Sequence, residues 1–233
     1  LVNYEIGDIV PCLAESWEFS DDGTALTFHL KEGVTFHDGT PFNAEAVKTD
    51  FEFAHPNPNF SNISAVAKLE SIEVVDEYTV TFHYPNAYFA YLMDFCYPET
   101  MVLVSPAVLE EGNYQSMNGV VGTGPYVYEE IVDGDYVRFV RNENYWREGP
   151  KVDTLTFRVV PEDGARIAML QTGEAQFAFP IPYEQAPLLA KNSKLELVAS
   201  PSIMQRYISM NVTQKPFDNP KVREAINYAI NRQ

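Results

Sequence analysis

The sequence predicts a mixed α/β fold with an antiparallel region in its middle. Two runs of alternating polarity, residues 69–75 and 79–84, are separated by Asp76-Glu77-Tyr78 and indicate a β-hairpin. Towards the C-terminus, strand-like runs alternate with runs of helical period, which is typical of α/β sheets. With 233 residues, 45% of them hydrophobic, the chain can bury a sizeable core in one large domain or two small ones.

Turn and capping signals separate the elements predicted in the first half. Ser20-Asp21-Asp22-Gly23 is a tight-turn sequence that leads into a β-branched and aromatic run. Asn43 is predicted to cap a helix that places Val47, Phe51 and Ala54 on one face. The predicted elements are a strand at 25–30, a helix at 44–53, a surface loop at 55–62, the hairpin above, and short helices at 88–95 and 106–111.

Glycine and proline mark the elements predicted in the second half. Asp133-Gly134 is a strong hairpin turn, Gly173 is predicted to close a helix, and Pro220 suits the first turn of another. The predicted strands are 126–132, 135–141, 155–160, 175–179, 195–200 and 204–212, and the predicted helices are 164–172, 185–190 and 219–230.

These elements predict one part inserted into another. We expect residues 1–37 and 150–233 to form the main α/β subdomain, and residues 38–149 to form a smaller inserted α+β subdomain. The sequence begins with Leu1 and stops at Gln233, directly after a helical pattern. We therefore expect both ends to be cuts through a longer polypeptide.

Composition argues against several classes of partner. The net charge of −17 repels phosphate backbones and anionic lipid headgroups, so nucleic acid is not expected as a partner. No run approaches the roughly 18 consecutive apolar residues of a membrane span. Cys12 and Cys96 match no metal-binding spacing and read as ordinary thiols, with one bridge between them left open.

The sequence contains no recognisable catalytic, metal or cofactor motif. No pair of histidines has the spacing of a zinc-binding helix, and no serine lies in a nucleophile elbow. The glycine-rich run 119–124 is followed by Pro125 and a strand, so it matches neither a phosphate-binding loop nor a dinucleotide fingerprint. His37, beside Asp38-Gly39, is interpreted as a turn residue that bonds local backbone. We expect no catalytic residue, no metal and no cofactor.

Two arginines on one predicted strand are candidates for binding an anion. Arg138 and Arg141 are three residues apart, so they point to opposite faces, and one of them is expected to face a core or cleft. A fixed guanidinium can clamp a carboxylate with two hydrogen bonds. A structural ion pair with one of the many acidic side chains is the alternative, and the sequence does not decide between them.

Four segments together resemble the extracytoplasmic solute-binding proteins of the peptide and nickel (family 5) ABC importers. The first contains Leu13-Ala14-Glu15-Ser16-Trp17, Phe36-His37-Asp38-Gly39-Thr40-Pro41 and Ala44-Glu45-Ala46-Val47 in order. The others are Gly122-Thr123-Gly124-Pro125-Tyr126, Arg141-Asn142-Glu143-Asn144-Tyr145-Trp146 and the run from Lys215 to Ile230. Their order and spacing fit the family along essentially the whole chain.

The resemblance implies a periplasmic-binding-protein-like fold of class II, cluster C type, in which two lobes close on a ligand. It implies that this chain is most of the first lobe, without the leader, the second lobe and the C-terminal return to lobe one. Such a protein is no enzyme. It captures a small ligand, here a short peptide or alternatively a nickel chelate, and delivers it to ABC permease subunits. We expect a monomer in the periplasm or a cell-surface lipoprotein, in contact with membrane only through a lipid anchor or the permease.

The resemblance also suggests which residues bind the ligand. Arg141 matches the arginine that reaches a chelator carboxylate in nickel-binding members. The segment 97–102 lacks the arginines that those members carry, and Glu99 would favour a cationic ligand group if it faces the cleft. Tyr207 or Asn211 is expected to face the ligand backbone, with a packing role as the alternative. The full predicted set is Arg141, Tyr97, Glu99, Met101, Tyr207 and Asn211.

Two other classes of function were weighed against this one. A secreted acidic hydrolase domain would use Glu99 and a second carboxylate, held about 5 Å or about 6.5–9.5 Å apart. A chaperone-like interaction module would need a large exposed apolar patch. The four linked segments favour the solute-binding protein.

Overall fold

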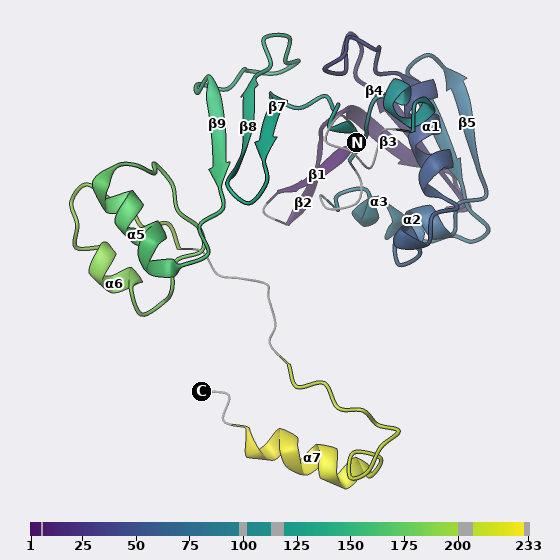
Figure 1. Ribbon diagram of the computed structural model, residues 1–233. Helices are drawn as coiled ribbons and strands as arrows, with labels where there is room; N and C mark the ends of the chain where they lie inside the picture. The colour runs from purple at the N-terminus through teal and green to yellow at the C-terminus, as the bar shows by residue number, and fades with distance from the viewer. Residues whose placement is uncertain (6, 98–101, 113–118, 200–206, 231–233) are drawn as a thin grey trace. The chain divides into compact units, whose positions relative to one another are not determined.

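The computed structural model describes all residues except 6, 98–101, 113–118, 200–206 and 231–233. Contacts group the chain into two units, Leu1–Val160 and Pro161–Gln233. Figure 1 labels most of the helices and strands.

The first unit is built around a four-stranded antiparallel sheet in the order β3-β4-β6-β5. The predicted hairpin forms β5 and β6, and β6 also pairs with β4, with Phe28 opposite Val80. A short ladder of β1 and β2, which the sequence did not predict, precedes this sheet. The strands are β1 (Val2–Glu5), β2 (Asp8–Pro11), β3 (Ala14–Phe19), β4 (Ala25–Leu30), β5 (Ser71–Asp76) and β6 (Thr79–His83).

The first unit also contains short helices, and the longest of them, α1, is capped by Asn43 as predicted. The Asn43 side chain accepts a hydrogen bond from the Ala46 backbone N–H at 3.0 Å, which satisfies a donor that the first helical turn leaves free. The segment predicted to be a loop at 55–62 contains a single 3₁₀ turn. The helices are α1 (Ala44–Ala54), η1 (Pro58–Phe60), α2 (Ser64–Ala67), α3 (Tyr91–Asp94) and α4 (Pro106–Glu110).

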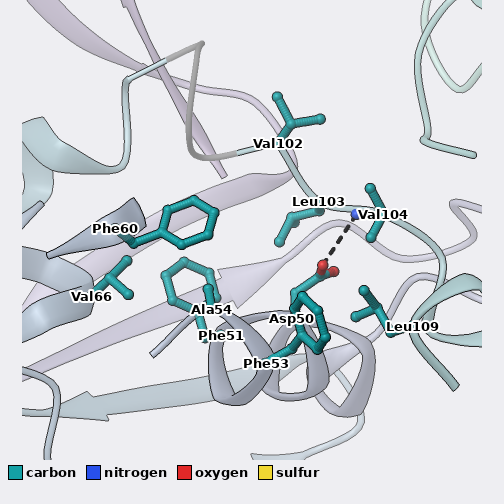
Figure 2. Close-up of a pocket in the computed structure, with 10 residues that line it drawn as sticks. All are labelled: Asp50, Phe51, Phe53, Ala54, Phe60, Val66, Val102, Leu103, Val104 and Leu109. Atoms are coloured by element: carbon teal, nitrogen blue, oxygen red, sulfur yellow. Dashed lines mark hydrogen bonds between the residues drawn. The ribbon is translucent and has the colours of Figure 1, made fainter. Parts of the chain in front are cut away.

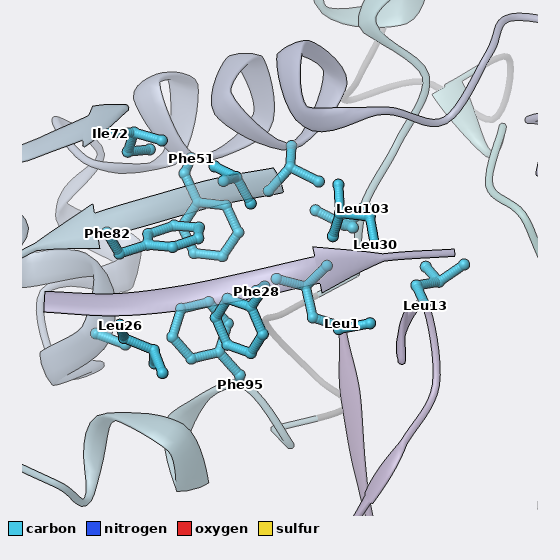
Figure 3. Close-up of a cluster of buried hydrophobic side chains, with 14 of the residues drawn as sticks. Leu1, Leu13, Leu26, Phe28, Leu30, Phe51, Ile72, Phe82, Phe95 and Leu103 are labelled. Atoms are coloured by element: carbon cyan, nitrogen blue, oxygen red, sulfur yellow. The ribbon is translucent and has the colours of Figure 1, made fainter. Parts of the chain in front are cut away.

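The hydrophobic core of this unit is aromatic at its centre. Phe82 on β6 is fully buried, and its ring lies 4.8 Å from that of Phe51 and 5.1 Å from that of Phe95, measured between centroids. Phe28 on β4 meets Phe95 at 4.8 Å (Figure 3). Rings from a helix, two strands and the α3 segment therefore interlock at distances that favour edge-to-face and tilted contacts.

A second antiparallel sheet, in the order β7-β8-β9, completes the first unit. Gly134 adopts a positive φ of 76° in the predicted turn between β7 (Tyr126–Val132) and β8 (Tyr136–Arg141). Strand β9 (Thr154–Arg158) pairs with β8 on its other edge. None of the residues of these three strands is fully buried, in contrast to β4 and β6.

The second unit contains three described helices, α5 (Asp163–Thr172), α6 (Ala186–Leu189) and α7 (Pro220–Ala229). Gly173 closes α5 in the left-handed conformation, as predicted, and the Asn219 side chain caps α7. Among the described residues of this unit, Leu189 alone is a buried hydrophobic residue.

Three strands predicted in the second unit are not observed in its described residues. The segments 175–179, 195–199 and 207–212 adopt no strand, and residues 200–206 lie outside the described part of the chain. A strand forms only when its backbone N–H and C=O groups meet a neighbouring strand, and no described segment pairs with these runs. The β-branched and aromatic residues of these segments were therefore not sufficient to predict a strand.

The predicted division into residues 1–37 with 150–233, and 38–149, stays a prediction about the lobe as a whole. Within the described residues, β4 pairs with β6, so one sheet joins strands from both sides of residue 38. All described strand pairs are antiparallel, and the mixed α/β character comes from the helices that alternate with them.

Candidate functional site

Three of the four segments that carry the family resemblance meet at one junction, formed by His37, the backbone of residues 122–124, Asn142 and Trp146. The His37 backbone N–H donates to the Gly122 carbonyl at 2.9 Å. The Gly122 N–H donates in turn to His37 Nδ1 at 3.3 Å, and His37 Nε2 lies 3.0 Å from the Gly124 carbonyl. These partners assign the neutral tautomer with its proton on Nε2, which donates to Gly124.

Two side chains from the segment after β8 complete the junction. Asn142 Nδ2 donates to the Gly124 carbonyl at 3.0 Å, and Trp146 Nε1 donates to the Thr123 carbonyl at 2.9 Å. The glycine-rich turn thus has its carbonyl groups held by residues remote in sequence. The prediction that His37 bonds local backbone was wrong in this respect, because its ring contacts residues 85 and 87 positions away.

The junction fixes the chain next to Arg141, the last residue of β8. Arg141 Nε and Nη2 each lie 3.0 Å from Glu143 Oε1, and Nη1 lies 2.5 Å from Asp153 Oδ1. The hydrogen bond to Glu143 and the charge of Asp153 raise the pKa of Arg141 above its ordinary value. The three side chains together carry a charge of −1, so the guanidinium is not a free anion site.

Both acidic partners of Arg141 are accessible to water. The side chains of Glu143 and Asp153 are 75% and 80% exposed, whereas that of Arg141 is 33% exposed. Ion pairs with such exposed partners are typically worth up to about 1 kcal/mol each. Another carboxylate can therefore replace one of them at low cost.

The second candidate arginine is also paired. Arg138 Nη1 lies 2.8 Å from Glu130 Oε1 and 3.7 Å from Glu129 Oε2, and the guanidinium stacks 5.1 Å from the Tyr136 ring centroid. The sequence left open whether these arginines form ion pairs or bind an anion, and in the structure both form ion pairs.

The remaining predicted ligand residues are not gathered into one site by the described contacts. Tyr97 is 57% exposed in the first unit, and Tyr207 is 84% exposed in the second. The Asn211 carboxamide oxygen accepts hydrogen bonds from the Thr213 backbone N–H and hydroxyl, at 3.1 and 2.7 Å. Glu99 and Met101 lie outside the described residues. Ligand binding by this set stays a prediction.

The described residues offer neither a metal-binding cluster nor a membrane-spanning helix. No group of three or more His, Cys, Asp and Glu side chains in that part of the chain is placed to hold a metal ion. No described helix is long and apolar enough to cross a membrane.

The first unit contains a cavity beside α1 that the sequence did not predict. It is a cavity of about 160 Å³ whose lining is apolar except for the Asp50 carboxyl, which is only 9% exposed (Figure 2). Asp50 lies three residues after Val47 and four before Ala54, on the helix face that was predicted to be apolar. An acidic residue on that face is the signal that could have revealed it.

Comparison with known proteins identifies the family of this chain. The sequence model of the family described as "Bacterial extracellular solute-binding proteins, family 5 Middle" matches residues 8–233. The chain belongs to this family of solute-binding proteins.

Relatives of known name are similar to this chain over nearly its whole length. The chain is 52% identical over 223 residues, 95% of its length, to the glutathione-binding protein GsiB of Salmonella typhi, and 50% identical over 222 residues to GsiB of Escherichia coli K12. It spans 43% of the length of these relatives. The relatives carry the name of a binding protein, and the comparisons give the hydrolase alternative no support.

Two solved structures agree with the fold. NikA from Brucella suis in complex with Fe(III)-EDTA matches with a TM-score of 0.87 at 29% identity, over 99% of this chain and 48% of NikA. DppA from Helicobacter pylori in complex with the peptide STSA matches with a TM-score of 0.85 at 26% identity, over 99% and 50%. The prediction of a periplasmic-binding-protein-like α/β fold is confirmed.

Proposed function

We propose that the protein to which this chain belongs captures a short peptide of the glutathione class outside the cytoplasm and delivers it to an ABC import permease. The observation that carries the proposal is the 52% identity to a glutathione-binding protein, sustained over 95% of this chain. No bond chemistry is involved, because such proteins act by closing two lobes on the ligand.

The net charge of −17 restricts how the protein can bind an anionic ligand such as glutathione. Glutathione carries two carboxylates and one ammonium group, so its net charge has the same sign as that of the protein. Binding an anion here requires a local cation that offsets the general repulsion. Arg141 is the proposed cation.

Arg141 can serve this role through exchange of partners. A ligand carboxylate would take the place of Glu143, whose side chain is mostly exposed and is released into water. The Asp153 pair and the junction at Asn142 would hold the guanidinium in position during the exchange. Tyr97, Glu99, Met101, Tyr207 and Asn211 are the further residues proposed to contact ligand.

A nickel chelate is the second candidate ligand, and the match to NikA in complex with the metal chelate Fe(III)-EDTA supports a chelate as the ligand class. A metal chelator presents carboxylates, as glutathione does, so Arg141 suits both. The absence of arginine from residues 97–102 counts against the chelate.

Native mass spectrometry of the full-length protein, as isolated and after mild denaturation, separates the two ligands. The proposal expects bound masses of short peptides, and glutathione should bind on addition to emptied protein. A single adduct that contains nickel and a small carboxylate would replace the peptide proposal with the chelate. Failure of calorimetry to detect binding of glutathione or any short peptide would contradict it.

Arg141→Gln tests the clamp, with Arg138→Gln as a matched control on the same strand. We expect Arg141→Gln to weaken glutathione binding by about 10-fold or more, the loss of one charge-assisted hydrogen bond. Arg138→Gln removes the same charge and should leave affinity unchanged. Equal affinities of the two variants would overturn the assignment of Arg141.

The 233-residue chain supplies one side of the proposed ligand site. We expect the chain to fold. We expect it to bind the ligand more weakly than the full-length protein by a factor of at least roughly ten, because half of the contacts are lost. Equal affinities by calorimetry would contradict this. A monomeric protein in the periplasm, or one held at the cell surface by a lipid anchor, completes the proposal.

A further inference from the structure

The cavity beside α1 has one polar group without a complete set of partners. Asp50 Oδ1 accepts a hydrogen bond from the Val104 backbone N–H at 3.3 Å. Oδ2 is buried and has no hydrogen-bond partner among the described residues. Leaving a carboxyl oxygen buried and unpaired costs free energy, so a group that donates a hydrogen bond to it would be stabilised there.

The rest of the lining suits a small ring. Phe51, Phe53 and Phe60 supply aromatic surface, and Leu103 and Leu109 supply aliphatic surface (Figure 2). The volume of about 160 Å³ is close to the roughly 150 Å³ of an apolar cavity that accepts benzene. A ligand here is therefore about the size of one six-membered ring with a short substituent.

Charge decides what the substituent is. A carboxylate in an apolar cavity is best neutralised by a cation that also donates hydrogen bonds, and a primary ammonium group does both. Aromatic faces attract the same cation, and the net charge of −17 raises the local concentration of cations around the protein. An anionic ligand would be repelled by the carboxylate, by the aromatic faces and by the net charge of the protein.

We propose that the cavity beside α1, which shares no lining residue with the junction at His37, is a binding site for a small organic amine that places its ring among the phenylalanines and its ammonium group on Asp50. The proposal does not depend on the ligand of the family site. Burial raises the pKa of the Asp50 carboxyl to about 8, which is the behaviour of a carboxyl that lacks such a partner.

Benzylamine is the probe that matches this description. Calorimetry measures its binding to the 233-residue chain at about pH 8.5, above the raised pKa of Asp50, so that the carboxyl is ionised. We expect one benzylamine per chain, with benzyl alcohol at least about 10-fold weaker and benzoate without binding, because only the amine pairs with the carboxylate. Equal affinity for benzyl alcohol and benzylamine would overturn the role of charge. No benzylamine binding at millimolar concentration would overturn the site.

Variants locate the site. Asp50→Asn keeps an acceptor for the Val104 N–H but removes the charge, and it should weaken benzylamine by about 10-fold or more. Glu52→Gln removes the same charge from an exposed position on α1 and should change nothing. Equal binding by the wild type and Asp50→Asn would contradict the proposal.

A third variant fills the cavity without touching the carboxyl. Ala54→Leu adds three carbon atoms to a lining position and should abolish benzylamine binding, while circular dichroism and the unfolding midpoint report whether the chain remains folded. Retained binding by a folded Ala54→Leu protein would place benzylamine elsewhere and overturn the assignment.

Discussion

The two units of this chain contain similar residues but bury them to very different extents. In the first unit, a continuous cluster of buried side chains runs from Leu1 to Leu103, and Phe28 and Phe82 are fully buried. In the second unit, Phe177 and Phe179 are 79% and 78% exposed. Hydrophobic residues form a core only where strands and helices bring several of them together, so composition alone did not distinguish the two units.

The same comparison applies to secondary structure. The helices of the second unit form with normal caps, because caps depend on a few adjacent residues. The described residues of its predicted strands at 175–179 and 204–212 form no strand, because strands depend on a partner. Substitutions placed in the two units test this difference.

Removing an aromatic ring should affect stability in one unit only. Phe82→Ala deletes a ring that contacts Phe28, Phe51 and Phe95, and we expect it to lower the free energy of unfolding by about 3–5 kcal/mol. Phe177→Ala removes a ring that is 79% exposed and should change it by no more than about 0.5 kcal/mol. Denaturant unfolding of the 233-residue chain measures both. Similar losses would show that the second unit shares the core.

The Asp50 carboxyl should make the stability of the first unit depend on pH. Its pKa is raised from 3.8 to about 8 by burial, so between these values the folded chain keeps a proton that the unfolded chain has released. The free energy of unfolding therefore falls as the pH rises, by up to about 1.4 kcal/mol per pH unit, and becomes constant above about pH 8.

Asp50→Asn isolates this contribution from that of the other titrating groups. The difference in unfolding free energy between the wild type and the variant, measured by urea denaturation from pH 5 to pH 9, should change with that slope up to about pH 8. Glu52→Gln, which alters an exposed carboxylate on the same helix, should show almost no such slope. A difference independent of pH would mean that Asp50 is ionised in the folded protein at pH 5.

Two asparagine caps offer a matched pair across the units. Asn43 accepts from the Ala46 N–H and Asn219 accepts from the Lys221 N–H, both at 3.0 Å. Asn43→Ala should lower the free energy of unfolding by about 1 kcal/mol, because α1 packs on the core. Asn219→Ala should reduce the helical signal in circular dichroism yet leave the unfolding midpoint unchanged, since α7 buries no residue. Equal shifts in midpoint would contradict this.

Local chemistry explains which parts of the fold and site could be predicted. The cap at Asn43, the turn at Gly134 and the helix end at Gly173 each follow from a few neighbouring residues, and the sequence predicted all three. The ring of His37 bonds to residues more than 80 positions away, and Asp50 lines a cavity closed by residues 102–104 and 109. Such long-range contacts depend on the folded arrangement, which periodicity and turn signals do not specify.

The ion pairs of Arg141 should contribute the least to stability, and this is what suits the residue to bind ligand. Glu143 and Asp153 are mostly exposed, so Arg141→Gln should lower the free energy of unfolding only slightly, and high salt should reduce the difference. Urea denaturation at low and high ionic strength measures it, with Arg138→Gln as the control on the same strand. A loss as large as that of Asn43→Ala would mean that the pairs hold the fold together, because a guanidinium that the fold requires could not exchange Glu143 for a ligand carboxylate at low cost.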